Sequence, residues 1–150
     1  MTDIIPKRVV LDTNVCLDLF VFNDPRWANI LAGLQNGSIH AVTKKECKDE
    51  WLAVLKYPHL PVTPNNIEQI CGRFEQMIEC ADLPSNPTYP LPACSDKDDQ
   101  KFLETARDSG AQYLITKDKA LLKLAKRIRK LGLFSIETPE QFLHSLQNTH

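Results

Sequence analysis

Glycine is scarce in this chain, with only five residues dispersed among 150. A loop that cradles the phosphates of a nucleotide needs several glycines close together, so no motif of that kind is present. The four histidines are scattered as well, and the five cysteines include no Cys-x-x-Cys pair. These absences argue against a metal site or a catalytic centre built from cysteine and histidine.

The sequence also has no long apolar run and no signal-peptide pattern. The uninterrupted apolar runs span only a few residues, far fewer than the ~20 that a membrane-spanning helix needs. Without a signal-peptide pattern, we expect a soluble, cytoplasmic protein with reduced thiols and no membrane partner. The formal net charge of −1 gives no basic excess, so a nucleic-acid partner would need a local basic patch.

The length and the balance of residue types predict one domain over residues 1–150, because hydrophobic residues make up 43% and charged residues 25%. Strand-like segments alternate with helical ones, which indicates a parallel sheet. The expected strands are residues 8–11, 38–42, 113–116 and 133–136. The expected helices are residues 15–20, 25–35, 43–55, 64–81, 96–109, 119–131 and a last one after Thr138.

Sequence signals mark the ends of several of these segments. Thr43 and Glu46 have the spacing of a capping box, as do Thr138 and Gln141. Four prolines between residues 82 and 94 predict an extended loop there, named below the proline-rich loop.

Acidic residues occur at separate places where they would face one pocket. Asp12 and Asp118 follow apolar strands, Asp99 lies in the first turn of a helix, and Glu50 lies mid-helix beside an apolar face. Ligands of open parallel sheets bind beyond the carboxyl ends of the strands. Converging carboxylates repel one another unless protons or a cation neutralise them, and hard oxygen ligands suit Mg²⁺ or Mn²⁺.

Simpler interpretations of the same acids remain open. Asp12 and Asp118 could each be a helix N-cap, and Glu50 could be a solvated helix residue. Asp96 and Asp98 could merely cap and charge the start of their helix. Glu46 lies one helical turn from Glu50 and competes with it as a ligand.

Four segments resemble the motifs of the PIN domain family, in the family's order. They are residues 9–15 (Val-Val-Leu-Asp-Thr-Asn-Val), residues 43–55 with Glu50, residues 96–106 with Asp99, and residues 113–118, which end at Asp118. The resemblance covers nearly the whole chain. It is greatest to a bacterial subgroup of toxin components of toxin–antitoxin pairs, relatives of the VapC toxins.

The resemblance implies a three-layer α/β/α sandwich with a central, mainly parallel sheet. It also implies a ribonuclease dependent on Mg²⁺ or Mn²⁺, with Asp12, Glu50, Asp99 and Asp118 as catalytic residues and metal ligands. Asp96 is an additional candidate ligand, and the role of Asp98 stays open. Asn14 and Thr116 match polar positions that would hold the carboxylates in place. The implied partners are RNA, an antitoxin protein and a second copy of the chain.

Basic residues concentrate in one segment, residues 117–130, around Asp118. In a helix their charges would face water, and this solvated face is the simpler interpretation. The alternative is a track for the RNA backbone, with Lys117, Lys119 and Lys123 as contacts next to the acids.

Two other functions are also compatible with the sequence. One is a PIN-like module that binds RNA or protein and cuts nothing. The other is phosphoaspartate chemistry, as in receiver domains and haloacid-dehalogenase-like phosphatases. The phosphatases usually carry a second aspartate two residues after the first, where this chain has Asn14.

Overall fold

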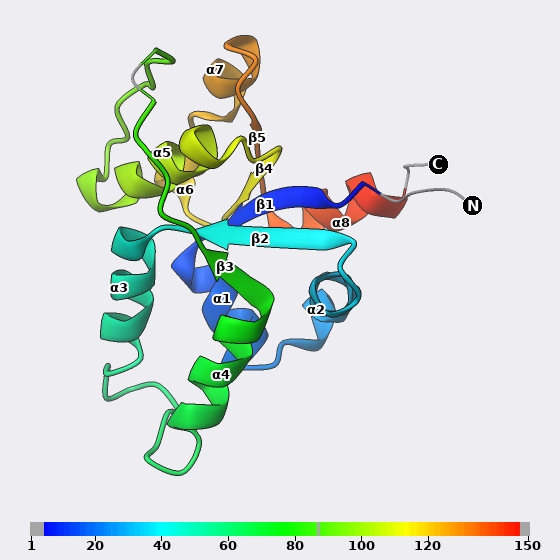
Figure 1. Ribbon diagram of the computed structural model, residues 1–150, viewed down its shortest axis with the longest axis vertical. Helices are drawn as coiled ribbons and strands as arrows, with labels where there is room; N and C mark the ends of the chain where they lie inside the picture. The colour runs from blue at the N-terminus through cyan, green and yellow to red at the C-terminus, as the bar shows by residue number, and fades with distance from the viewer. Residues whose placement is uncertain (1–4, 87, 148–150) are drawn as a thin grey trace.

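The computed structural model describes residues 5–86 and 88–147 and is built around one parallel sheet (Figure 1). The sheet has five strands in the order β3-β2-β1-β4-β5, and every neighbouring pair is parallel. The strands are β1 (Lys7–Leu11), β2 (Ile39–Thr43), β3 (Ile78–Cys80), β4 (Tyr113–Ile115) and β5 (Ser135–Glu137). The predicted parallel α/β sheet is therefore confirmed.

Helices cover both faces of the sheet, which gives the three layers of an α/β/α sandwich (Figure 1). The short helices η1 (Pro25–Trp27) and η2 (Lys97–Asp99) precede longer ones. The α-helices are α1 (Thr13–Phe20), α2 (Ala28–Asn36), α3 (Lys45–Val54), α4 (Ile67–Met77), α5 (Gln100–Ser109), α6 (Lys119–Leu122), α7 (Ala125–Lys130) and α8 (Pro139–Gln147). None of the helices in the described ranges is both long and apolar enough to cross a bilayer.

Strand alternation divides the core into two hydrophobic clusters. Val9 and Leu11 point into the cluster that α1, α2, α4 and α8 cover. Val10, between them, points to the opposite cluster, under α5, α6 and α7. Burial on both faces of the sheet explains why the sequence of β1 contains a continuous apolar run. Trp51 stacks on Phe74 in the first cluster, with ring centroids 4.9 Å apart.

The strand order reverses beside β1, and the space beyond the carboxyl ends of β1 and β4 is named the crevice below. The chain adds β2 and β3 on one side of β1 and then crosses to add β4 and β5 on the other. Leu11, the last residue of β1, pairs with Ile115, the last residue of β4. The carboxyl ends of these two strands therefore meet at the switch point, where ligands bind in folds of this type.

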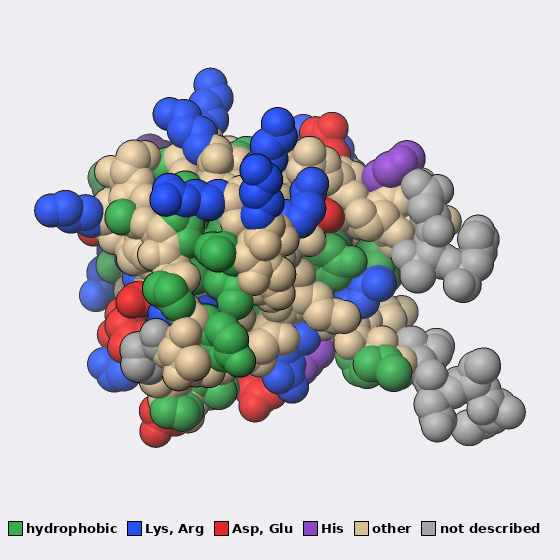
Figure 2. All heavy atoms as spheres, turned by 90° about the horizontal axis from the view of Figure 1, so that it is seen from above, with side chains coloured by type: hydrophobic (Ala, Val, Ile, Leu, Met, Phe, Trp, Pro, Cys, Tyr) green, Lys and Arg blue, Asp and Glu red, His purple; other side chains and the backbone are tan. Residues whose placement is uncertain are grey.

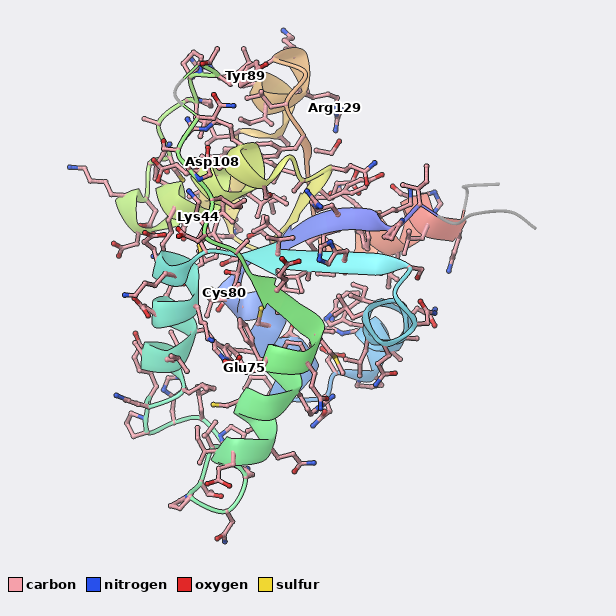
Figure 3. The ribbon with its side chains drawn as sticks, viewed as in Figure 1. Lys44, Glu75, Cys80, Tyr89, Asp108 and Arg129 are labelled. Atoms are coloured by element: carbon pink, nitrogen blue, oxygen red, sulfur yellow. The ribbon has the colours of Figure 1, made fainter. Side chains whose placement is uncertain are left out.

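The described residues of the proline-rich loop form no helix or strand, as predicted, although the chain turns at residues 88–89, and buried charges attach the loop to the sandwich. Asp108 on α5 accepts a hydrogen bond from the backbone N–H of Asn86 at 2.9 Å. The same carboxylate pairs with Lys44 Nζ at 2.6 Å and with Arg107 Nε at 2.9 Å. Figure 3 shows Asp108 and Lys44 at the side of this loop. The loop is thus attached to α5 at Asn86.

Two local predictions were wrong. The helix expected over residues 64–81 is shorter, because α4 ends at Met77 and residues 78–80 form the edge strand β3. Ile78 is buried in the strand and also falls on the apolar face that the helical spacing predicts, so the hydrophobic pattern hides the change. Thr43 does not cap α3: it ends β2, paired with Cys80, and the N-cap is Lys44 without a side-chain bond.

The second capping box was predicted correctly. Thr138 Oγ1 accepts a hydrogen bond from the backbone N–H of Gln141 at 3.1 Å. Gln141 Oε1 accepts one from the backbone N–H of Thr138 at 2.9 Å. These reciprocal bonds fix the start of α8, as the spacing of the two residues indicates.

Candidate metal centre

Asp12 lies at the base of the crevice, directly after β1, and is 3% exposed. Its Oδ1 accepts a hydrogen bond from the backbone N–H of Thr13, and its Oδ2 accepts one from Thr116 Oγ1, both at 2.7 Å. Both donors are neutral, so they orient the carboxylate without neutralising it. Burial raises the pKa of Asp12 to about 6 against the effect of these bonds, and nearby Glu50 and Asp118 raise it further.

Three further acids gather at the mouth of the same crevice. Asp96, Asp99 and Asp118 each offer an oxygen atom, and these atoms lie within 4.8 Å of one another. Asp96 is the N-cap of η2, and Asp99 closes that helix. Asp118 is the N-cap of α6, where its Oδ1 accepts a hydrogen bond from the backbone N–H of Ala120 at 2.8 Å. The structure thus brings together acids that are about twenty residues apart in sequence.

Asp99 is the least satisfied member of this group. It is 8% exposed, and its buried Oδ2 receives no hydrogen bond from any donor in the described ranges. Burial raises its pKa to about 7; the contact with Asp118 and the charges of Asp118, Asp12 and Asp96 act in the same direction. Asp99 and Asp118 can share a hydrogen bond only while one carboxyl is protonated. A buried carboxylate oxygen without a donor, on a side chain that lies among other carboxylates, is a place for a cation.

The donor set fits a hard divalent metal. Asp96, Asp99 and Asp118 supply converging carboxylate oxygens, and Asp12 adds a fourth carboxylate whose charge is felt at Asp99. Mg²⁺ and Mn²⁺ both take oxygen ligands of this kind and keep water in their remaining positions. No histidine or cysteine belongs to this three-acid group, which disfavours a zinc site.

Glu50 lies beside Asp12 and outside the three-acid group. Its Oε2 accepts a hydrogen bond from Thr13 Oγ1, and its Oε1 pairs with Lys101 Nζ at 2.7 Å. Glu46, its competitor, is exposed and lines a separate pocket of about 320 Å³ that also contains Cys80. Of the two glutamates, Glu50 is the one that contacts residues of the crevice.

The two polar residues predicted to hold the carboxylates differ in their surroundings. Thr116 is fully buried, donates to Asp12 Oδ2, and accepts a hydrogen bond from the backbone N–H of Asp118 at 2.9 Å. One hydroxyl thus connects the acids at the ends of β1 and β4. The side chain of Asn14 is exposed and makes no hydrogen bond to the described part of the chain.

The basic residues next to Asp118 also divide into two kinds. Lys117 Nζ pairs with Asp18 Oδ2 at 2.6 Å, so its charge is already compensated by α1. Lys119 and Lys123 are exposed and belong to none of the ion pairs in the described ranges. Figure 2 shows lysine and arginine side chains gathered on the face where α7 lies.

Sequence reasoning missed Thr13 and Lys101, which hold the two oxygens of Glu50. Both residues stand inside the recognised motifs, Thr13 directly after Asp12 and Lys101 two positions after Asp99. Their role depends on the packing of α1 and α5 against α3, which no local pattern encodes.

The raised pKa values predict how stability changes with pH in the absence of metal. Asp12 and Asp99 hold protons in the folded state up to about pH 6 and 7, whereas the ordinary pKa of an aspartate is 3.8. The folded state therefore binds more protons than the unfolded state between these values, and stability falls as pH rises through this window. We expect the metal-free melting temperature to be lower at pH 7.5 than at pH 5, and Mn²⁺ to restore it.

The matched variants are Asp99→Asn and Asp98→Asn, of which Asp98 is exposed. At pH 7.5 without metal, Asp99→Asn should melt about 2–8 °C above wild type, because it removes one charge from the cluster, an effect of roughly 1–2 kcal/mol. It should also lose the stabilisation by Mn²⁺. Differential scanning calorimetry measures both, and equal melting temperatures for Asp99→Asn and Asp98→Asn would contradict the prediction.

Comparison with known proteins identifies the family. A search of curated proteins finds no match. The family model of the PIN domain matches residues 8–120, a segment that contains Asp12, Glu50, Asp99 and Asp118. PIN domains are generally nucleases that depend on divalent metals. The matched segment spans most of the sheet and all the acids of the crevice, and the chain belongs to the PIN domain family.

Proposed function

We propose that this protein is an endoribonuclease that hydrolyses RNA phosphodiester bonds with a divalent metal, Mg²⁺ or Mn²⁺. The observation that carries the proposal is Asp99, whose Oδ2 is buried without a donor and whose side chain contacts Asp118 at the switch point of a PIN fold. Residues of this type in this position need a cation, and family membership makes a nuclease the natural use of that cation.

The side chains of the crevice have separable tasks in this proposal. Asp96, Asp99 and Asp118 would hold the metal, and Asp12 would complete the acidic set. Thr116 fixes the relative position of the carboxylates by bonding to both strand ends. A bound metal supplies a water of lowered pKa and offsets negative charge on the phosphate. The protons on Asp99 and Asp12 must leave as metal binds, so metal affinity should fall below about pH 6–7.

Cleavage of labelled single-stranded RNA in Mn²⁺ or Mg²⁺ is the direct test. We expect wild type to cut, and EDTA to abolish cutting. Asp12→Asn and Asp99→Asn should each lose at least about 100-fold in rate, because each removes a charge that no other residue replaces. RNA cleavage that persists in EDTA, or in both Asp12→Asn and Asp99→Asn, would contradict the proposal.

Neighbouring acids provide the controls. Asp98→Asn and Glu46→Gln change exposed carboxylates and should cut at close to the wild-type rate. Glu50→Gln should be slower than Glu46→Gln, because Glu50 alone of the pair contacts Thr13 and Lys101. The comparison separates a requirement for these particular acids from a general effect of net charge.

Exposed cations beside the crevice support an RNA backbone track. Lys119 directly follows Asp118, Lys123 is the C-cap of the same helix, and the cations of α7 continue the basic face. Lys117 is the weaker candidate because Asp18 already pairs with it. Contacts of this kind hold the phosphate backbone and do not select the sequence.

Salt dependence tests the track without any cleavage. In EDTA, the slope of log binding constant against log salt should become shallower by ~1.4 in the Lys119→Ala/Lys123→Ala double variant, at about 0.7 per lost phosphate contact. Fluorescence anisotropy with single-stranded RNA measures this slope. A Lys45→Ala/Lys56→Ala variant removes the same charge from α3 and the turn after it, and an equal change there would reject the track.

We further propose that the nuclease is the toxin of a toxin–antitoxin pair, acts in the cytoplasm, and works as a homodimer that an antitoxin protein inhibits. The similarity of the four motifs to the VapC-related subgroup supports this finer proposal. The antitoxin would act by covering the acidic crevice.

Growth on induction tests the toxin role. Expression of wild type in a bacterial host should arrest growth within a few generations, because uncontrolled RNA cleavage stops translation. Asp99→Asn, expressed to the same level, should not arrest growth. Normal growth with active wild-type nuclease in the cell would refute the toxin role and leave the nuclease assignment standing.

A further inference from the structure

Lys101 occupies a fixed position at the rim of the crevice. Its Nζ lies 2.7 Å from Glu50 Oε1 and donates to the backbone carbonyl of Asp98 at 2.7 Å. Only 23% of its side chain is exposed. The residue's own carbonyl accepts a hydrogen bond from Thr105 Oγ1 at 2.7 Å. The ammonium group is therefore held in place by the Asp98 carbonyl of η2 as well as by Glu50.

Positive charge is distributed unequally among the acids of the crevice. Glu50 has a lysine of its own, and its second oxygen is taken by Thr13. In the described ranges, Asp12, Asp96, Asp99 and Asp118 form no ion pair with any lysine or arginine. Among the acids of the crevice, Glu50 is thus the one with a basic counter-charge in the described ranges.

We propose that Lys101 is a positioning residue that serves as a built-in counter-cation. It holds Glu50 and takes the electrostatic place of a second metal ion, so that the crevice binds a single divalent ion at Asp96, Asp99 and Asp118. This inference rests on the proposed function, because it concerns how many metal ions the nuclease centre binds.

A tethered ammonium competes well against a free ion for Glu50. In two-metal sites the ions are about 3.5–4 Å apart and share carboxylates, so a second ion would have to recruit Glu50. There it would meet the repulsion of the Lys101 ammonium, 2.7 Å from Glu50 Oε1, which would have to move away before the ion could bind. Because Lys101 is attached to the same fold, its effective concentration at Glu50 is of millimolar order or higher. Because Lys101 outcompetes a second ion for Glu50, the crevice binds a single metal ion.

Counting bound ions without RNA tests the proposal. Isothermal titration calorimetry and electron paramagnetic resonance of Mn²⁺ should give one ion for wild type. Lys101→Met should bind a second ion at millimolar Mn²⁺, because Glu50 is left without a counter-charge. Lys101→Arg should still bind one, since the charge is kept, and Lys101→Met/Glu50→Gln should return to one. Lys97→Met, an exposed position just before Asp98, is the control and should also bind one.

The outcomes separate this proposal from the nuclease assignment. Two ions in wild type, or one ion in Lys101→Met, would overturn the role of Lys101 and leave the metal nuclease intact. No ion in wild type at any concentration would overturn the metal centre itself, and this inference with it. Circular dichroism shows whether Lys101→Met folds. If it does not, the wild-type count still tests the proposal, because two ions in wild type would overturn it.

Discussion

Repulsion between carboxylates that the sheet forces together is the constraint on which the rest of the crevice depends. Parallel strands β1 and β4 end at the same edge, so Asp12 and Asp118 cannot separate without breaking the pairing of Leu11 with Ile115. Burial removes the water that would otherwise screen their charges. The crevice therefore has to acquire positive charge, either as protons on Asp12 and Asp99 or as a bound cation.

The hydrogen bonds around these acids hold them in position without neutralising them. Asp12 receives neutral donors from Thr13 and Thr116, and Asp118 receives the backbone N–H of Ala120. Both acids are also N-caps, of α1 and α6 respectively, so the simpler capping interpretation is correct as far as it goes. It does not exclude a metal, because an ionised carboxylate has about four lone-pair sites and a cap uses only one.

Much of the fold and of the acidic set could be predicted from the sequence, because both depend on local signals. The apolar runs that end before Asp12 and Asp118 predict buried strands, and parallel strands bring their ends together. The edge strand β3 could not be predicted: it is three residues long and continues the helical spacing of α4. Lys101 was missed because its contact with Glu50 joins α5 to α3, and that contact exists only after the helices pack.

If the protein acts on RNA as proposed, the charge of the crevice would also link metal binding to RNA binding. A phosphate backbone meets repulsion from Asp96, Asp99 and Asp118 unless their charge is compensated, and the chain as a whole carries a net charge of −1. Attraction at a distance therefore has to come from the cations of α6 and α7, while close approach requires a cation among the acids. Linkage makes this dependence reciprocal: if the metal tightens RNA binding by some factor, RNA tightens metal binding by the same factor. In this arrangement a metal held weakly by the free protein would be held firmly once RNA lies on the basic face.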